Sequence, residues 1–254
     1  MKRLPIAFAV LCVFISPSLF SGQSAPVGEA ERIVQKMDDL YRSSASEALV
    51  EMEIITPRWQ RILKMKAWSE GLEKTFIRIL EPRKEAGIAT LRIGNEMWNY
   101  LPKTNKVIKI PPSMMMSSWM GSDFTNDDLV KEFTFIESYH FEMAAPASPR
   151  PGMVYVKCIP KAGLPIVWGH IIIEAEQSDY MPVWEGYYDE KGNLVREMLF
   201  KEVKTFGSRR IPSVMELIAR TKEGQKTVLR YLEAQFDVAI DPDIFTLRNL
   251  RGGI

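Results

Sequence analysis

The feature of this sequence that most restricts its fold is a long succession of strand-like runs with almost no helix between them. Apolar and polar residues alternate in many runs, as at Val50, Met52 and Ile54, which two glutamates separate. Such alternation predicts strands with one buried face. We expect strands at about 49–56, 61–69, 73–81, 87–93, 96–101 and 106–110, then at about 134–144, 153–160, 167–176, 181–189, 194–205, 210–221 and 226–237. Turn sequences such as Gly94-Asn95 separate neighbouring runs, so the chain predicts one long antiparallel meander.

One long helix is expected, over residues 27–42. Its apolar residues recur at spacings of three and four, which places them on one face: Ile33, Val34, Met37, Leu40 and Tyr41. We expect this face, with Val34 and Met37, to lie against the concave side of the sheet. Because a long sheet must cover or close its apolar face, a barrel-like curl is the expected architecture.

Two shorter helices are expected at about 126–132 and 242–250. Thr125 is followed at the third position by Asp128, which is a variant of the capping box. Asp241 precedes Pro242, which places a capping residue before a proline at the first helical position.

The N-terminus has the pattern of a secretory signal peptide. Lys2 and Arg3 precede an apolar run, and small residues follow at 21–24, so we expect cleavage after residue 24. The apolar run is too short to span a bilayer, and no later stretch approaches the roughly 20 apolar residues required. Lipid attachment at Cys12 is disfavoured because Leu11 stands where a small residue is expected.

The remaining chain, residues 25–254, is expected to form a single soluble domain. Removing residues 1–24 takes two of the 33 basic residues and none of the 32 acidic ones, which leaves a net charge of −1 and makes nucleic acid an unsuitable partner. Cys158 is then the remaining cysteine, so no intramolecular disulfide can form and stability must come from an apolar core. No glycine- or serine-rich linker divides the chain.

No catalytic, metal or cofactor site is expected. His140 and His170 each lie in an apolar strand-like run without a neighbour at metal-ligand spacing, and Cys158 lacks a nearby base. The acidic residues at 123–128 do not match a calcium loop, because Asp128 replaces the obligatory glycine. The methionines near residue 115 could ligate copper(I), but no histidine or cysteine accompanies them.

Two groups of short motifs have a specific counterpart in a known family. The central group comprises Trp98, Tyr100, Leu101, Pro102, Lys103, Lys106, Met120-Gly121-Ser122-Asp123-Phe124-Thr125 and Asp128. The later group comprises Ile211-Pro212, Thr227, Phe245-Thr246 and Leu250. Together they resemble the LolA-like family of outer-membrane lipoprotein-sorting proteins over essentially the whole mature chain.

This resemblance implies a mainly β fold of the LolA/LolB type. A strongly curved antiparallel sheet would form an incomplete β-barrel, covered by the N-terminal helix and short helices, around an apolar cavity for acyl chains. It also implies a periplasmic location. The same fold serves envelope-stress sensing, so the fold alone does not determine the role.

The leading hypothesis is a periplasmic carrier or chaperone, not an enzyme, that holds the acyl chains of a lipoprotein or lipid during transfer between membranes. We expect a monomer, and the resemblance implies an inner-membrane transporter as donor. The alternative is a periplasmic sensor or an accessory interaction module of a membrane transporter complex.

Two strand residues and one loop are the candidate ligand-binding residues besides the helix. Trp98 and Tyr100 lie on one strand face and are expected to line the cavity or its rim, although packing in the sheet core is the alternative. The apolar loop residues are expected to form a mobile flap between Pro111-Pro112 and Gly121, or else to be folded permanently onto the domain: Met114, Met115, Met116, Trp119 and Met120.

Overall fold

The structure is a computed structural model that describes residues 28–41, 43–131, 135–164 and 166–252. The predicted signal peptide lies outside these ranges. The strands are β1 (Ala45–Ile55), β2 (Gln60–Glu70), β3 (Lys74–Glu81), β4 (Ala89–Ile93), β5 (Glu96–Leu101), β6 (Lys106–Lys109), β7 (Tyr139–Met143), β8 (Met153–Pro160), β9 (His170–Glu176), β10 (Pro182–Tyr188), β11 (Leu194–Phe206), β12 (Arg209–Ala219) and β13 (Lys226–Phe236). The helices are α1 (Glu29–Tyr41), α2 (Asn126–Lys131), α3 (Phe135–Ser138) and α4 (Leu247–Gly252), and the 3-10 turns are η1 (Pro102–Thr104), η2 (Pro112–Met114) and η3 (Pro242–Phe245).

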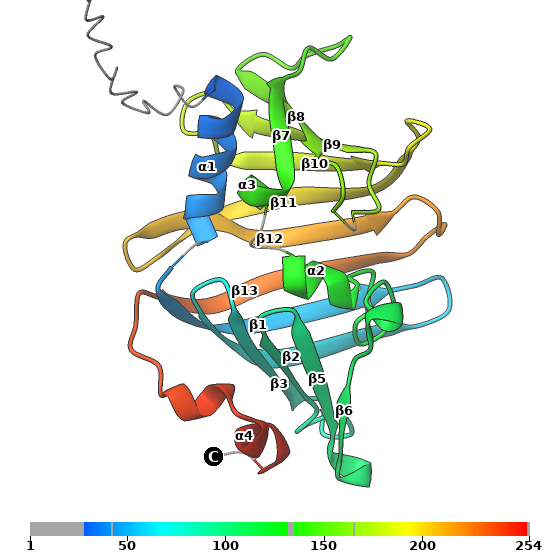
Figure 1. Cartoon of the computed structure of the whole chain (residues 1–254), viewed down its shortest axis with the longest axis vertical. Helices are drawn as coiled ribbons and strands as arrows, with labels where there is room; N and C mark the ends of the chain where they lie inside the picture. Colours follow the sequence, from blue (N-terminus) through cyan, green and yellow to red (C-terminus); the bar gives the residue numbers. More distant parts are fainter. Residues whose placement is uncertain (1–27, 42, 132–134, 165, 253–254) are drawn as a thin grey trace, which may run out of the picture.

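All of these strands belong to one antiparallel sheet, in the order β6-β5-β4-β3-β2-β1-β13-β12-β11-β10-β9-β8-β7 (Figure 1). The sheet curves around the interior and does not close, because β6 and β7 are its two edges. The predicted fold class, a curved antiparallel sheet forming an incomplete barrel, is therefore confirmed. The expectation of one unbroken meander is wrong at one place. Consecutive strands pair except β6 and β7, and β1 pairs instead with β13.

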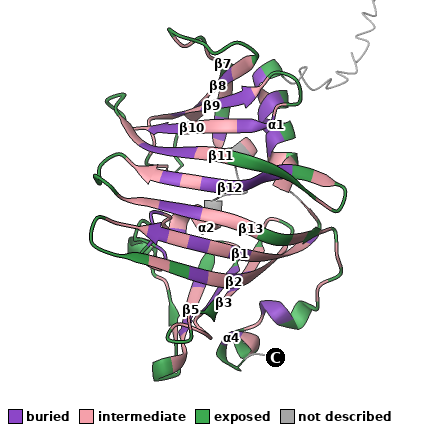
Figure 2. Ribbon diagram, turned by 180° about the vertical axis from the view of Figure 1, so that it is seen from behind, coloured by how far each residue is buried: buried purple, intermediate pink, exposed green. Residues whose placement is uncertain are grey.

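The inward face of the sheet is built from the alternation that the sequence shows. On β1, Val50, Met52 and Ile54 are at most 5% exposed, and Met52 lies opposite Leu229 of β13. Buried residues recur along the middle of successive strands (Figure 2). The β1–β13 pair divides the sheet into two halves, β6 to β1 and β13 to β7. The buried face continues across this pair, so the two halves surround one interior.

Some element boundaries differ from the predictions. β1 begins at Ala45, which pairs with Glu70 at the end of β2, whereas the predicted strand begins at 49. The predicted strand at 134–144 is helix α3 followed by the short strand β7, because periodicity does not separate strand from helix in a short apolar run. The predicted C-terminal helix is divided into η3 and α4.

Helix caps form where the sequence predicted them. The backbone N–H of Thr125 donates to Oδ2 of Asp128 at 2.7 Å, and the N–H of Asp128 donates to Oγ1 of Thr125 at 3.1 Å, which is a reciprocal capping box. At η3, the N–H of Asp243 donates to Asp241 Oδ1 at 2.9 Å.

The helices cover different faces of the sheet. α1 packs against β7, β8 and β12, and it buries Ala30, Ile33, Val34 and Met37. At the other end of the molecule, η3 and α4 lie on the outer face of β3–β5 (Figure 1). In the part of the chain that the structure describes, no helix is long and apolar enough to cross a membrane.

Candidate functional site

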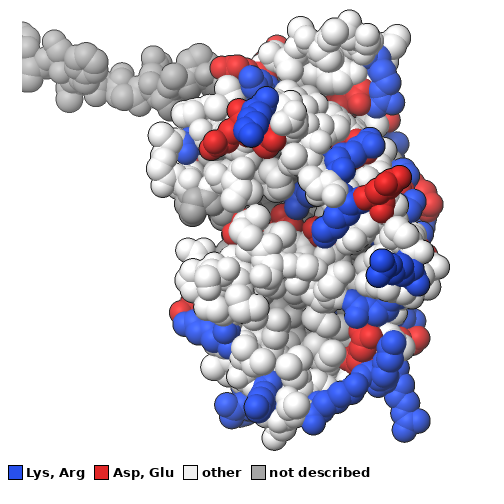
Figure 3. Space-filling view, turned by 90° about the vertical axis from the view of Figure 1, so that its right-hand side faces the viewer, with Lys and Arg blue, Asp and Glu red and all other residues white. Residues whose placement is uncertain are grey.

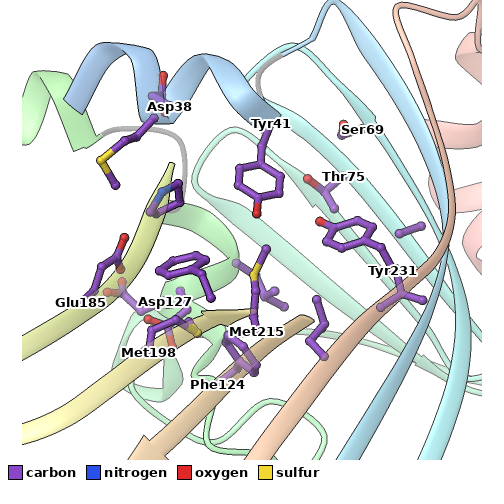
Figure 4. Close-up of a pocket in the computed structure, with 18 of the residues that line it drawn as sticks. Asp38, Tyr41, Ser69, Thr75, Phe124, Asp127, Glu185, Met198, Met215 and Tyr231 are labelled. Carbon is purple, nitrogen blue, oxygen red and sulfur yellow. The ribbon is translucent and has the colours of Figure 1, made fainter. Parts of the chain in front are cut away.

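The curved sheet encloses a cavity of about 350 Å³. Its walls come from α1, from β1–β3 on one side, from β9–β12 on the other, and from β13 between them. Figure 4 shows Tyr41, Met215 and Tyr231 in its middle, with Ser69 and Thr75 toward one end and Glu185 and Asp127 toward the other. Cavities of about 300–1,000 Å³ are the usual size for small-molecule ligands.

Most of the cavity wall is apolar. Val50, Met65 and Ile77 line it from one half of the sheet, and Ile171, Ile173 and Met198 line it from the other half. Leu229 and Tyr231 of β13 pack against the apolar clusters of both halves. The cavity therefore lies where the two halves of the sheet meet, and its surface suits an alkyl chain better than a polar solute.

The predicted helix residues lie in this wall. Val34 and Met37 of α1 line the cavity and are 3% and 7% exposed. Tyr41, at the end of the same helix, stacks on Tyr231 with ring centroids 6.3 Å apart and donates a hydrogen bond to the Pro212 carbonyl at 3.1 Å. These contacts fix the end of α1 against β12 and β13.

Of the five predicted loop residues, the structure brings Trp119 into the cavity wall. Its indole N–H donates to Thr90 Oγ1 at 3.2 Å, and the side chain is 3% exposed. The turn that follows is tied to β13 through Asp123, whose N–H donates to Thr227 Oγ1 and whose Oδ2 accepts from the same hydroxyl, both at 2.9 Å. Gly121 supplies the positive φ of +77° that this turn requires. The specific MGSDFT motif therefore anchors the loop.

The methionines of the loop lie differently from the prediction. Met114 and Met116 are 47% and 45% exposed, and neither lines the cavity. Met115 is half-buried outside the cavity, whereas Met120 packs against the core beside Trp119. Met114 ends η2 and Met116 lies just beyond it, whereas Trp119 lies next to the turn that Asp123 ties to β13. A flap that moves stays a prediction.

The expectation that Trp98 and Tyr100 line the cavity is wrong. Both pack on the outer face of β5 in a cluster with Phe245 and Leu250, and the Tyr100 hydroxyl donates to Asn105 Oδ1 at 3.2 Å. Period-two alternation shows that two residues share a face, but it does not show which face is inside. Because η3 and α4 cover the outer face here, apolar residues occur on both faces of β5.

A polar wall at the end of the cavity that contains Asp127 and Glu185 was not predicted. Arg196 of β11 donates to both carboxylate oxygens of Asp128, at 3.0 and 2.8 Å, and its guanidinium lies 4.9 Å from the Trp168 ring and 4.2 Å from the Tyr187 ring. Burial alone would lower the pKa of Arg196, but Asp128 raises it, so the guanidinium stays charged. Asp128 therefore has two roles, since it caps α2 and also pairs with the enclosed guanidinium of Arg196.

Glu185 of β10 belongs to the same polar wall. Its Oε2 accepts a hydrogen bond of 2.7 Å from the Tyr187 hydroxyl. Burial raises the pKa of the Glu185 carboxyl above its usual range, although Tyr187 and Arg196 act in the opposite direction. Burial likewise raises the pKa of Tyr139 and of the Cys158 thiol, which is fully buried and therefore stays protonated.

The histidines lie apart from this wall. His140 is exposed on β7, and His170 stacks on Tyr188 with centroids 4.5 Å apart. Among the residues described, no group of three or more His, Cys, Asp or Glu side chains is placed to hold a metal ion.

Comparisons with known proteins agree with this architecture. A family model with the description "Uncharacterized protein" matches residues 71–252. No curated protein sequence matches the chain. A DUF1329 family protein from Desulfovibrio piger has a similar structure, with a TM-score of 0.79 and 20% identity over 89% of this chain and 100% of that chain.

Two further solved structures are similar. A putative outer membrane lipoprotein-sorting protein domain from Vibrio parahaemolyticus gives a TM-score of 0.74 at 22% identity, covering 87% of this chain and 98% of that one. The LolA superfamily protein NE2245 from Nitrosomonas europaea gives a TM-score of 0.71 at 19% identity, covering 86% and 98%. Since the family model matches well over half of the sequence, the chain belongs to that family, and its fold is the one that the lipoprotein-sorting domain and the LolA superfamily protein share.

Proposed function

We propose that this protein is a periplasmic carrier or chaperone that holds the acyl chain of a lipoprotein or lipid in its cavity during transfer between membranes. The observation that carries the proposal is the apolar cavity of about 350 Å³ inside the curved sheet, with Val34, Met37 and Trp119 in its wall. The lipoprotein-sorting domain and the LolA superfamily protein to which the chain is similar support it.

Burial supplies the binding energy that such a carrier needs. Each methylene removed from water contributes about 0.8 kcal/mol, so a long alkyl chain contributes on the order of 10 kcal/mol before ordering is subtracted. Holding and releasing a chain breaks no covalent bond, so the proposal requires no catalytic group.

The cellular setting is part of the same proposal. Residues 1–24 would direct the chain to the periplasm, where residues 25–254 would act as a single monomeric domain. An inner-membrane transporter would deliver the cargo, and a partner with a better apolar site would remove it.

The second candidate is a periplasmic sensor or an accessory module of a membrane transporter complex. The exposed Met114 and Met116 favour a docking role for their loop. Figure 3 shows that the middle of the face turned to the viewer is largely uncharged, whereas Lys and Arg side chains lie along its right border, at its lower end and at its left edge. In this reading the cavity would stay empty and the loop would bind the partner.

The placement of two tryptophans gives a test of cavity binding. In a variant that keeps Trp119 as its sole tryptophan, adding a long-chain alcohol should shift the emission spectrum saturably, because Trp119 lies in the cavity wall. A variant that keeps only Trp98 is the matched control. It should show no shift, since Trp98 packs on the outer face beneath η3 and α4. Equal responses, or none in either variant over several chain lengths, would count against the cavity as the binding site.

A further inference from the structure

Arg196 carries an enclosed hydrogen-bond donor that the protein does not use. Its side chain lines the cavity and is 9% exposed. Its Nε–H is buried and has no hydrogen-bond partner among the described residues. A buried donor without an acceptor lowers stability, so such groups are uncommon in folded proteins and call for an explanation. We therefore consider this donor for ligand recognition.

The positive charge of Arg196, unlike its Nε–H, is already matched. Its Nη1 atom donates to Oδ1 and Oδ2 of Asp128, at 3.0 and 2.8 Å. The Nε–H thus offers a hydrogen bond without a net charge to balance. An anionic group placed here would be enclosed without a counter-charge, and an ammonium group has no lone pair to accept the bond. A neutral acceptor meets neither penalty.

The surroundings of Arg196 place this donor where the cavity reaches the surface. Val167 lines the cavity and is 49% exposed, and Trp168 follows it in the chain. The Trp168 and Tyr187 rings lie over the guanidinium, with centroids 4.9 and 4.2 Å from its carbon. Tyr187 is held within β10, whereas Trp168 belongs to the segment between β8 and β9. Trp168 is therefore the ring that can yield to a group entering from the cavity.

We propose that Arg196 binds the carbonyl oxygen through which an acyl chain is attached to its head group, so that the cavity selects acyl esters and amides over free fatty acids. The proposal rests on the proposed carrier function, because the chain itself would occupy the apolar part of the cavity. A carbonyl oxygen is an uncharged acceptor, as this position requires. The Nε–H donates to it once the Trp168 ring has shifted, and the head group leaves the cavity past Val167.

Ligands with and without a carbonyl group test the proposal. Binding of methyl dodecanoate and of dodecyl methyl ether is measured by titration calorimetry, and the ratio of the two affinities is compared between variants, so that ligand hydration cancels. We expect the unmodified protein to favour the ester. Dodecanoate at about pH 8, where it is ionised, should bind at least about tenfold more weakly than the ester, because its charge would be buried without a partner. Tighter binding of dodecanoate would show a site for anions instead.

The variant Arg196→Lys removes the donor and keeps the cation. The Cε methylene of lysine takes the place of Nε, and the ammonium group beyond it can still pair with Asp128. The preference for the ester should fall at least about tenfold, as for a lost hydrogen bond from a charged group. The matched control is Thr75→Val. It removes Oγ1 of Thr75, the other buried polar atom without a partner among the described cavity residues, at the opposite end, and should keep the preference.

The infrared spectrum of the bound ester gives a reading that does not depend on affinity. Methyl dodecanoate carrying carbon-13 in its carbonyl group should show a lower C=O stretching frequency in the unmodified protein than in a hydrocarbon solvent, because a hydrogen bond weakens the C=O bond. The shift should persist in Thr75→Val and disappear in Arg196→Lys. An unshifted band in the unmodified protein, or a shift or ester preference that persists in Arg196→Lys, would overturn the carbonyl proposal. Failure of the ester and the ether alike to bind would overturn the carrier function itself.

The carbonyl group belongs to an ester in a glycerolipid and to an amide in an N-acylated peptide. Displacement of methyl dodecanoate by dodecanoyl glycerol or by N-dodecanoylglycinamide distinguishes these sources, and displacement by either supports the proposal. The dodecyl ether of glycerol lacks the carbonyl and should compete at least about tenfold less well than dodecanoyl glycerol. Equal competition by these two glycerol compounds, or none by either acyl compound, would contradict the role of the carbonyl.

Discussion

Replacing Arg196 with methionine should lower the free energy of unfolding by about 3–5 kcal/mol, because it leaves the carboxylate of Asp128 enclosed without its cation. The two side chains are 9% and 21% exposed, so water compensates little. The substitution also removes the guanidinium from the Trp168 and Tyr187 rings. Urea denaturation measures the effect, and thermal unfolding should shift downward by roughly 2–4 °C for each kcal/mol lost.

A matched substitution separates this effect from the general loss of an arginine. Arg230→Met on β13 removes the partly exposed ion pairs with Glu51 and Glu53 of β1, whose N and O atoms are 3.5 and 2.8 Å apart, and should change the free energy of unfolding by at most about 1 kcal/mol. Adding Asp128→Asn to Arg196→Met should recover part of the loss, since asparagine is uncharged and can still cap α2. Equal losses in Arg196→Met and Arg230→Met would show that the buried pair is not special.

Changing Val34 and Met37 together to aspartate should destabilise the fold or abolish ligand binding. Both residues are almost fully buried in the cavity wall, so the variant places two carboxylates on an apolar surface. The lost burial of the two side chains alone amounts to about 1.5–3 kcal/mol for each. Thermal unfolding and titration with a long-chain alcohol report the two effects separately.

The control for this double variant is Arg32→Gln with Lys36→Gln, which changes the net charge equally on the exposed side of α1. It should keep both stability and binding. If the aspartate variant also kept both, α1 would be peripheral to the cavity, and its assignment as part of the binding site would be wrong.

Local patterns in the sequence predicted most of the fold. Period-two alternation located the strands, and the spacing of Thr125 and Asp128 predicted a cap that forms as a reciprocal pair of hydrogen bonds. These features depend on residues a few positions apart. The pairing of β1 with β13 brings together strands from the two ends of the chain, which no local pattern specifies.

The candidate site was harder to predict for the same reason. Alternation placed Trp98 and Tyr100 together but could not show that η3 and α4 would cover their face. The polar wall joins Asp128 of α2 to Arg196 of β11, which are 68 positions apart. A basic residue in the apolar run of β11 and an acidic one at the inward position of β10 were the available signals. Asp128 lies beside Arg196 only once the sheet has curved.

The most direct test of the account is mass spectrometry of organic extracts from the protein purified without detergent. We expect an alkyl-chain molecule in near-stoichiometric amount. The variant Ala67→Trp places an indole in the cavity wall of β2 and should be depleted of that molecule while remaining folded. A folded, lipid-free protein, or equal lipid in the unmodified protein and in Ala67→Trp, would contradict the claim that the cavity carries an acyl chain.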